Sequence, residues 1–447
     1  MAALVLEAGL CLLIVLAPLP FGSVGPLGRG SLEALALLLT AVWALNGWRE
    51  RLPLPPRAVR LGALGLLALA AVQLVPLGAS ALARLSPWSA ALRASLGDPA
   101  HLPTTLSIAP DATASALRTG AATVGLLFVA TTVVARRGSA RLGTAMLVSA
   151  AFQGLYGVLV LASGHDRIWD VPKTAYLDSA TGTFVNRNHF AGFLAATLPV
   201  GFGLVVGALR DARRRPGARG LAAMLGNDGS RSLLLGLLAL LGLSGVLLSY
   251  SRAGTALALV AVATTVASVS GGAALRRAAI VLAIVAVAAV PLADIGFERL
   301  VDRYADAATD VAAGGGRLEV WRDTLTLIRH APILGCGFGA FTWAFPAASS
   351  AGVRLHYTHA HNDLLQLLAE GGAAAAALVL LIALPVARRA GTIVVSGRDP
   401  VAAGAAFGLA ALALHGLVDF NFHIPANLAI AGILAGVVLG ASWTDES

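Results

Sequence analysis

Residues 232–270 read SLLLGLLALLGLSGVLLSYSRAGTALALVAVATTVASVS, and Arg252 is the single charged residue among them. The apolar runs on either side of Arg252 are each about 18 residues long, close to the length at which an α-helix crosses the hydrocarbon core of a bilayer. The segment between them is too short to form a true loop. It therefore predicts a pair of membrane helices, with Arg252 at or just beneath the outer interface.

The rest of the chain has the same character. It contains 447 residues, of which 57% are hydrophobic and 12% charged, and its mean hydropathy is +0.80. These values exclude a soluble globular protein. The apolar residues do not alternate with the two-residue period of a barrel strand. We therefore expect an all-α integral membrane protein that forms a single polytopic domain over residues 1–447.

About twelve transmembrane helices are predicted from the apolar runs. The predicted spans are residues 3–20, 31–48, 59–77, 119–135, 141–162, 189–209, 232–250, 253–270, 278–295, 363–386, 401–418 and 424–442. The first run contains Glu7 and has no basic segment before it, which indicates a retained helix rather than a cleaved signal peptide.

Basic side chains predict the orientation. With the N-terminus inside, the predicted cytoplasmic segments hold 18 basic and 6 acidic groups. The opposite side holds 14 basic and 17 acidic groups when Glu7, Glu33 and Glu370 are counted there. This asymmetry follows the positive-inside rule, so both termini are expected in the cytoplasm. The net charge of +9 then needs no nucleic-acid partner.

Three long segments, 78–118, 163–188 and 296–362, are left on the extracytoplasmic side. Long irregular segments in compact proteins often carry function. The third contains RLEVWRDTLTLIRH (317–330), bounded by glycines before it and by Pro332 after it. We expect an amphipathic helix there, on the membrane surface or over a cavity, in which Leu318, Trp321, Leu325 and Ile328 share one face. A small capping helix without a catalytic part is the alternative.

Four basic side chains are predicted near the outer interface. Arg187 opens the sixth span, Arg252 lies between the seventh and eighth, Arg317 begins the amphipathic helix, and His361 precedes the tenth span. An ionisable group at mid-helix costs at least about 2.5 kcal/mol, and this cost falls at helix ends, where long side chains reach water. Taken singly, each of these residues could have a purely structural role. Their predicted position on one side of the membrane favours a shared site.

The chemistry of these side chains suggests a ligand. Three guanidinium groups from separate segments would bind a polyanion, because each pairs with phosphate oxygens and stays charged. A lipid-linked diphosphate suits that depth, with its tail in the bilayer and its head at the interface. A histidine such as His361 is suited to act as a general base on a hydroxyl.

Three histidines stand close together in HYTHAHNDLLQLLAEGG (356–372). The spacing of His356, His359 and His361 matches no zinc signature, so we expect neither a metal nor another cofactor. His356 and His359 are interpreted as the polar rim of a membrane helix. The two cysteines, Cys11 and Cys336, predict no disulfide framework.

Two further polar stretches are of interest. HGLVDFNFHIP (415–425) places Asp419, Asn421 and His423 at the outer junction of the last two spans. They could orient a catalytic group or form the rim of the bundle, and the rim is slightly favoured. GCGFGA (335–340) lacks the strand and helix of a dinucleotide fingerprint, so Gly335 and Gly337 are expected to form a tight turn that allows close backbone approach.

Taken together, these stretches resemble the Wzy_C-type O-antigen ligase and polymerase superfamily. The segments that carry the resemblance are NRNHFAGFLA (186–195), SRAG (251–254), GRLEVWRDTLTLIRHAPILGCGFGAF (316–341), HAHNDLLQLLAEGG (359–372) and HGLVDFNFHIPAN (415–427), within about residues 180–430. The resemblance implies a metal-independent glycosyltransferase of GT-C type in the bacterial inner membrane. Its active site would face the periplasm and transfer a glycan from undecaprenyl diphosphate to an acceptor.

The resemblance also implies roles for individual residues. His361 and Asn362 match the pair that begins with the essential histidine of the ligase branch, and Gly372 falls at its first expected glycine, whereas Ala375 replaces a further one. Arg187 and Arg252 correspond best to the family's arginines. Arg317 is a third candidate for binding the diphosphate. Residues expected to support the site are Asn362, Asp363, Trp321, Gly335, Gly337, Asp419 and His423.

Several functions remain open at this point. The acceptor could be lipid A–core, a growing glycan or a protein hydroxyl, because variable loops would recognise it. A membrane transporter for polysaccharide is the alternative from another class. Transporters often contain paired, interrupted helices around a midplane site, and no such pair is found. Glu370, about two turns into its span, is the main candidate for a mid-membrane ionisable group.

Overall fold

The computed structural model describes residues 2–48, 50–95, 104–214, 227–270, 316–350 and 356–441. Seven helices in these residues are long and apolar enough to cross a membrane. They are α2 (Pro26–Gly47), α6 (Pro110–Arg137), α7 (Ala140–Ser163), α8 (Arg187–Arg214), α10 (Asn227–Leu248), α11 (Arg252–Val269) and α16 (Asp363–Ser396). The expected all-α membrane protein is thus confirmed, and the count of twelve spans stays a prediction.

Four more helices coincide with predicted spans. They are α1 (Ala2–Leu16), α3 (Arg57–Gln73), α17 (Pro400–His415) and α18 (Pro425–Gly440). The predicted span 278–295 lies outside the described residues. Shorter elements are α4 (Ala79–Leu85), α5 (Pro87–Ser95), α14 (Arg317–His330), α15 (Phe341–Ala344), the turns η1 (Phe21–Ser23), η3 (Phe345–Ala347) and η4 (Asn421–His423), and an antiparallel pair of strands, β1 (Arg167–Ile168) and β2 (Val171–Pro172).

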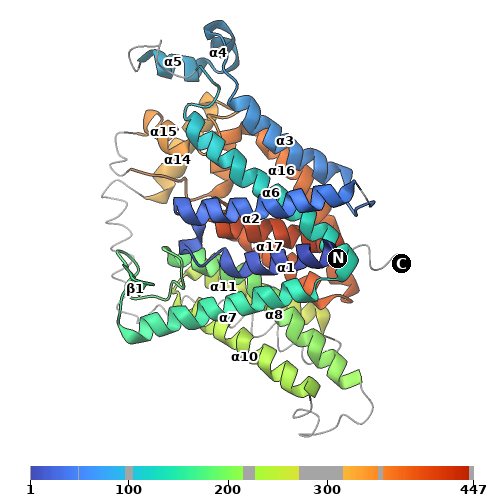
Figure 1. Ribbon diagram of the computed structural model, residues 1–447. Helices are drawn as coiled ribbons and strands as arrows, with labels where there is room; N and C mark the ends of the chain where they lie inside the picture. Colours follow the sequence, from blue (N-terminus) through green and yellow to red (C-terminus); the bar gives the residue numbers. More distant parts are fainter. Residues whose placement is uncertain are drawn as a thin grey trace.

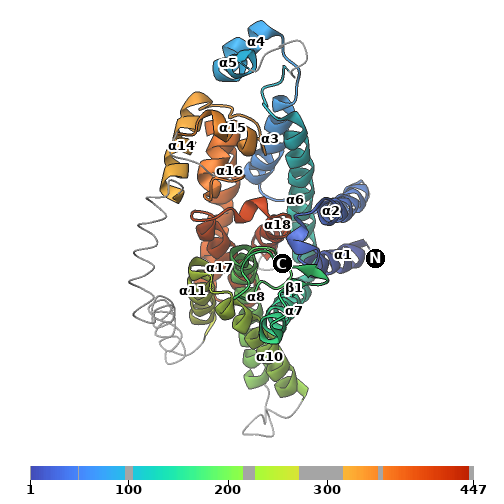
Figure 2. The same ribbon diagram turned by 90° about the vertical axis from the view of Figure 1, so that its left-hand side faces the viewer.

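The long helices lie side by side, and short elements gather at one end of the bundle. Figure 1 shows α14, α15 and β1 at this end, on the left, and the start of α1 at the opposite end. We call residues 316–350 the cap, and the end that carries them the cap side. Figure 2 looks onto the cap side. Helix α8 lies deep in the bundle, where it packs against α7, α10, α11 and α17.

A buried carboxylate shows which helix ends share the side opposite the cap. Glu7 Oε2 lies 2.6 Å from Arg137 Nε and 2.6 Å from Arg141 Nη1. Both arginines flank the short connection between α6 and α7. The start of α1 therefore lies with this predicted cytoplasmic loop, as expected for an N-terminus inside. Counting Glu7 with the extracytoplasmic groups was wrong, because its ion pairs hold it beside that loop.

Glycines allow α18 to lie directly on the backbone of α6. Cβ atoms placed on Gly432, Gly436 and Gly440 would come within 2.9, 2.8 and 2.6 Å of carbonyl oxygens of α6. The spacing of four residues puts all three glycines on one helix face. Small residues at such spacing let membrane helices approach closely and gain van der Waals contact, which drives their association in lipid. The glycine richness of the chain thus has a packing role.

Helix α16 is interrupted at Gly372, where φ is 62° and ψ is −164°. An interruption inside a helix leaves backbone N–H and C=O groups without helical partners, which is costly away from water. The segment 332–337 of the cap supplies the missing partners. The four bonds run from Cys336 N to Ala369 O (2.9 Å), Gly337 N to Glu370 O (3.0 Å), Ala373 N to Pro332 O (2.8 Å) and Ala374 N to Ile333 O (3.0 Å).

The expected tight turn at GCGFGA is confirmed. Gly335 and Gly337 have φ of 67° and 114°, in the region that favours glycine. A Cβ on Gly335 would collide with the backbone of Glu370, and one on Gly337 would lie 2.6 Å from Ser107 Cβ. Both glycines therefore allow the cap to approach α16 and the segment before α6.

The amphipathic helix forms over the predicted residues, but its packing differs from the simplest expectation. Val320 and Leu327 are fully buried in a second apolar cluster with Phe341 and Phe345, apart from the main core of the bundle. Leu318 and Leu325 are 71% and 44% exposed. The helix therefore has two apolar faces, and the one containing Leu318 and Leu325 is turned outward.

We expect Gly436→Leu to weaken the packing of α18 on α6. The new side chain would meet backbone atoms that cannot rotate away, and overpacking of this kind costs about 1–3 kcal/mol. The melting temperature of the purified protein in detergent should fall clearly. Gly236→Leu is the control, because no atom of the described residues lies within 4 Å of a Cβ at that position of α10. Equal melting temperatures for the two variants would contradict the role given to the glycine contacts.

Candidate active site

The connection between α17 and α18, residues 416–424, is the point where the starts of other helices meet. Helix α16 begins against it, since the Asp363 N–H donates to Gly416 O at 2.6 Å. Helix α14 also begins against it, since Arg317 Nη1 donates to Val418 O at 3.0 Å. The starts of two helices, one in the cap and one in the bundle, are thereby placed next to the same short connection.

Asp419, in the middle of this connection, is buried and ionised. Its Oδ2 accepts a hydrogen bond from Asn188 Nδ2 at 2.8 Å, and its Oδ1 lies 3.6 Å from His189 Nε2 and 3.7 Å from His361 Nδ1. Burial raises the pKa of Asp419, but the two histidines and the Phe420 N–H outweigh burial and hold this pKa well below its usual range. The rim interpretation was therefore wrong for Asp419, whose side chain is enclosed.

His361 lies on a strained and tightly held stretch of backbone. Its φ is 50°, in the left-handed region that side chains seldom adopt. The preceding residue, Ala360, is fully buried and bonded on both sides: Trp321 Nε1 donates to its carbonyl at 3.0 Å, and its N–H donates to Gln366 Oε1 at 3.0 Å. The His361 side chain itself is 28% exposed. Strain of this kind clusters at functional sites, where the surroundings fix it.

Asn362 and Asp363 are used to build the start of α16. Asn362 Oδ1 accepts from the Leu365 N–H at 3.0 Å, which caps the helix. Asp363 Oδ1 lies 2.8 Å from His423 Nδ1, and its Oδ2 accepts from the Phe422 N–H at 3.2 Å. Among the residues proposed to orient His361, Asp419 is thus the one whose carboxylate faces the imidazole.

Two neighbouring histidines are held in fixed protonation states. Burial alone would lower the pKa of His423, but the hydrogen bond to Asp363 and the nearby Glu370 carboxylate raise it to about 10. Burial, with the nearby His423, lowers the pKa of His359 to about 3. His423 is therefore a cation at neutral pH and His359 is neutral, so neither is matched to proton exchange at that pH.

The rim interpretation holds for one histidine and fails for another. His356 is exposed. His359 is not at a rim, because its ring stacks on Phe420 with centroids 4.1 Å apart and its Nδ1 lies 3.2 Å from Gln366 Nε2. Among the described residues, no group of three or more His, Cys, Asp or Glu side chains is arranged to hold a metal ion.

Each of the three candidate arginines is the first residue of a helix. Arg187 and Arg317 begin α8 and α14, and Arg252 begins α11, where a Cβ on Gly254 would lie 3.1 Å from His415 Cε1. A cation at a helix N-terminus is disfavoured by the helix dipole, whereas an anion is favoured there. Arg187 and Arg317, whose charges both act on Tyr176, therefore leave a region suited to a negatively charged ligand, and Arg252 begins α11, which packs on α8.

Tyr176 connects two of these arginines with Asp419. The Arg187 guanidinium carbon lies 5.4 Å from the centre of the Tyr176 ring, a cation–π contact. Burial raises the pKa of Tyr176; Asp419 raises it further, while Arg187 and Arg317 lower it, so all three charges lie near the phenol. Nothing in the sequence around Tyr176 marked it. Asn188, His189 and His415 were also missed as individual residues, although they lie within the stretches quoted above.

Glu370 is a buried acceptor that fastens the cap. Its Oε2 accepts from the Gly339 N–H at 2.8 Å, and its Oε1 accepts from Gln366 Nε2 at 3.0 Å. The backbone at the break is also clamped by Gln73, whose Nε2 donates to Glu370 O at 2.9 Å and whose Oε1 accepts from the Phe338 N–H at 3.0 Å. This use of Glu370 disfavours the role of a mobile transport carboxylate. A sequence signal existed, because Gln366 and Glu370 are polar residues four apart in an apolar helix.

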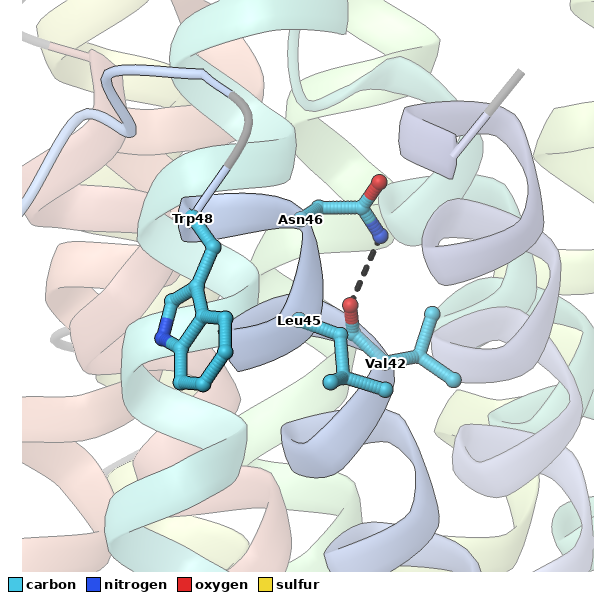
Figure 3. A pocket seen from close by; sticks show the side chains of 4 residues that line it. All are labelled: Val42, Leu45, Asn46 and Trp48. Carbon is cyan, nitrogen blue, oxygen red and sulfur yellow. Dashed lines mark hydrogen bonds between the residues drawn. The ribbon is translucent and has the colours of Figure 1, made fainter.

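Cavity volume does not mark this site. A cavity of about 510 Å³ lies at the end of α2 and is lined by Val42, Leu45, Asn46 and Trp48. Figure 3 shows that Asn46 Nδ2 turns back onto Val42 O, at 2.7 Å, rather than toward a ligand position. None of the described residues that line it is ionisable. The groups that could carry chemistry are gathered around Asp419 instead.

The pH dependence of stability should reveal the His423 cluster. Its folded pKa of about 10 exceeds the ordinary 6.5, so the stabilisation is complete below about pH 6.5 and is lost as pH rises toward 10. We expect the melting temperature in detergent to fall over this range, and to fall less steeply in His423→Gln. His356→Gln, at an exposed histidine, should keep the wild-type slope. An unchanged slope in His423→Gln would contradict the assignment.

Trp321→Phe should loosen the segment that holds His361. The variant keeps an aromatic side chain but lacks the indole N–H, so the buried Ala360 carbonyl is left unpaired, which costs about 1–3 kcal/mol. We expect faster hydrogen–deuterium exchange in residues 356–362 and a lower melting temperature. Trp343→Phe is the control, because Trp343 is 58% exposed. Exchange rates that stay at the wild-type level in Trp321→Phe would show that this hydrogen bond does not hold the segment.

Comparison with known proteins adds to this geometry. A family model described as O-antigen ligase, Wzy_C, matches residues 237–380. The matched range contains Arg252, Arg317, Trp321 and His361, and it ends before Asp419. No curated protein sequence matches the chain. The match covers about a third of the chain and supports the resemblance to the O-antigen ligase and polymerase superfamily found in the sequence.

Proposed function

We propose that this protein transfers a glycan from an undecaprenyl-diphosphate donor to an acceptor hydroxyl, with His361 as the general base. The family implies glycan transfer of the O-antigen ligase kind. The observation that carries the proposal is the pairing of a partly exposed His361 with the buried, ionised Asp419, 3.7 Å from its Nδ1. Asp419 and its neighbour Val418 contact the starts of α8 and α14, the helices that begin with Arg187 and Arg317.

The pairing suits proton transfer. With Nδ1 turned toward Asp419, Nε2 is the ring nitrogen available to the acceptor hydroxyl. As the hydroxyl oxygen attacks the anomeric carbon, its proton passes to Nε2, and the Asp419 carboxylate stabilises the imidazolium that forms. A positioned base contributes roughly 10²–10⁴-fold to such a step. Direct displacement of this kind inverts the anomeric carbon.

The arginines act on the leaving group. Negative charge grows on the diphosphate as the glycosidic bond breaks, and cations fixed in advance stabilise that charge without reorganisation. Arg187, Arg252 and Arg317 are proposed for this role, with Arg187 held over Tyr176 and Arg317 held on Val418 O. The N-termini of α8, α11 and α14 add partial positive charge in the same region.

We further propose the membrane setting that the topology predicts. The protein would be a GT-C-type enzyme of the bacterial inner membrane, with both termini in the cytoplasm and the cap in the periplasm. Lipid A–core, a growing polysaccharide and a protein hydroxyl are the acceptor classes, and each gives a distinct product in the cell.

The test replaces His361 in cells that lack the chromosomal gene. His361→Asn is preferred to Ala, because Asn tolerates the left-handed backbone found at this position. We expect transfer to fall by roughly 10²-fold or more. Asp419→Asn should cause a smaller loss, because the base remains but loses its anionic partner. Surface glycans would be separated into lipid A-linked, polymeric and protein-linked fractions.

The control is His356→Asn, at an exposed histidine outside the Asp419 contacts, with membrane levels of all variants matched by immunoblot. It should keep wild-type glycans. Full transfer by His361→Asn at normal protein level would refute the base assignment. A gene deletion that removes all three glycan fractions from cells, while membrane extracts of those cells still transfer glycan, would indicate a transport defect. That result would refute the enzymatic function itself.

A further inference from the structure

The connection between α1 and α2 is strained in a way that the proposed chemistry does not explain. Phe21, Gly22 and Ser23 are consecutive residues with φ of 58°, 67° and 60°. A left-handed run is costly for residues that carry a side chain, and it persists only where the surroundings fix it. Ser23 Oγ donates to Ala17 O at 2.7 Å and closes the connection onto the end of α1.

This connection forms one wall of an apolar groove. The groove has a volume of about 230 Å³, and its lining comes from α1, from the connection and from α2. Its lining includes Leu16 of α1, Pro20 and Ser23 of the connection, and Ser31 and Leu35 of α2. Leu16 is 43% exposed and Ser31 is exposed, so the groove opens at the surface of the bundle. Among the residues that the structure describes, no charged side chain lines it.

The same connection separates the groove from the candidate active site. A Cβ on Gly22 would lie 2.6 Å from Phe184 Cδ1 and 3.4 Å from Ile424 Cγ2. Thr183 Oγ1 donates to Pro18 O at 2.6 Å. Phe184 stands three residues before Arg187, and Ile424 directly follows His423. The groove and the site are thus on the two sides of one rigid connection.

We propose that this groove binds the isoprenoid segment of the lipid-linked donor that adjoins the diphosphate. The inference rests on the proposed function, because it takes a diphosphate bound near Arg187 as given. Such a ligand must lead its first isoprene units from the charged site back into the bilayer. The isoprenoid chain would leave the charged site around the connection that contacts Phe184 and Ile424, and the apolar groove on its other side, which opens at the bundle surface, would receive it. The strained backbone holds its wall in place before the ligand arrives.

The test uses photolabelling in lipid nanodiscs. The probe is a synthetic polyprenyl diphosphate that carries a diazirine on the isoprene unit nearest the diphosphate. We expect crosslinks in the peptides that contain residues 13–35, lost in the presence of excess unmodified polyprenyl diphosphate but not of added phospholipid. Ser31→Trp should fill the groove and reduce labelling about ten-fold. Leu16→Trp is a second filling variant in case the first folds poorly.

Leu37→Trp is the matched control. Leu37 lies on α2 like Ser31, is 39% exposed and is not among the described residues that line the groove. It should label like the wild type. Labelling that added phospholipid displaces equally well, or that persists in both filling variants, would show a bulk-lipid contact and overturn the proposal. Absent crosslinks in a wild-type protein that transfers glycan would overturn the groove alone. Groove labelling in a protein without transfer activity would support the groove while the proposed function fails.

Discussion

The arrangement of the site depends on a single buried anion. A carboxylate removed from water is costly unless charged or hydrogen-bonding partners surround it. Asp419 obtains these partners from α8, through Asn188 and His189, and from the segment before α16, through His361. Residues far apart in the sequence are brought together because they satisfy one charge. The same anion then becomes available to a catalytic histidine.

Charge also positions the cap, whereas close contact positions the helices. His423 lies 2.8 Å from Asp363 and 3.9 Å from Glu370, so a single imidazolium is shared between the start of α16 and the carboxylate that fastens the cap. Between the spanning helices the contacts are of another kind, with glycines against backbone in α17 on α8 and α18 on α6. Because lipid tails are as apolar as the helices, the hydrophobic effect contributes little to helix association in a membrane. Close van der Waals packing therefore holds the helices of the bundle together.

Much of this architecture could be predicted from the sequence, and the failures have physical causes. Apolar runs located the spans, and glycines with Pro332 located both ends of α14. The sequence did not show which face of α14 packs inward, because Val320 and Leu327 are as apolar as Leu318 and Leu325. The break at Gly372 was not predicted, since hydropathy continues through it and its partners come from the cap. The burial of Asp419 depends on neighbours from other helices, and Tyr176 lies in a stretch without any regular pattern.

The break in α16 has a consequence for how the protein is made. The helix has 34 residues, which would extend roughly 51 Å if straight, well beyond the ~30 Å hydrocarbon core. Its bend needs hydrogen-bond partners from residues 332–337, which in the proposed orientation must first cross the membrane. In that orientation, the hydrogen bonds that the break needs can form only once the cap has docked on α16. In the proposed orientation, membrane insertion and completion of the active site are thus separate events, and the second would take place outside the cytoplasm.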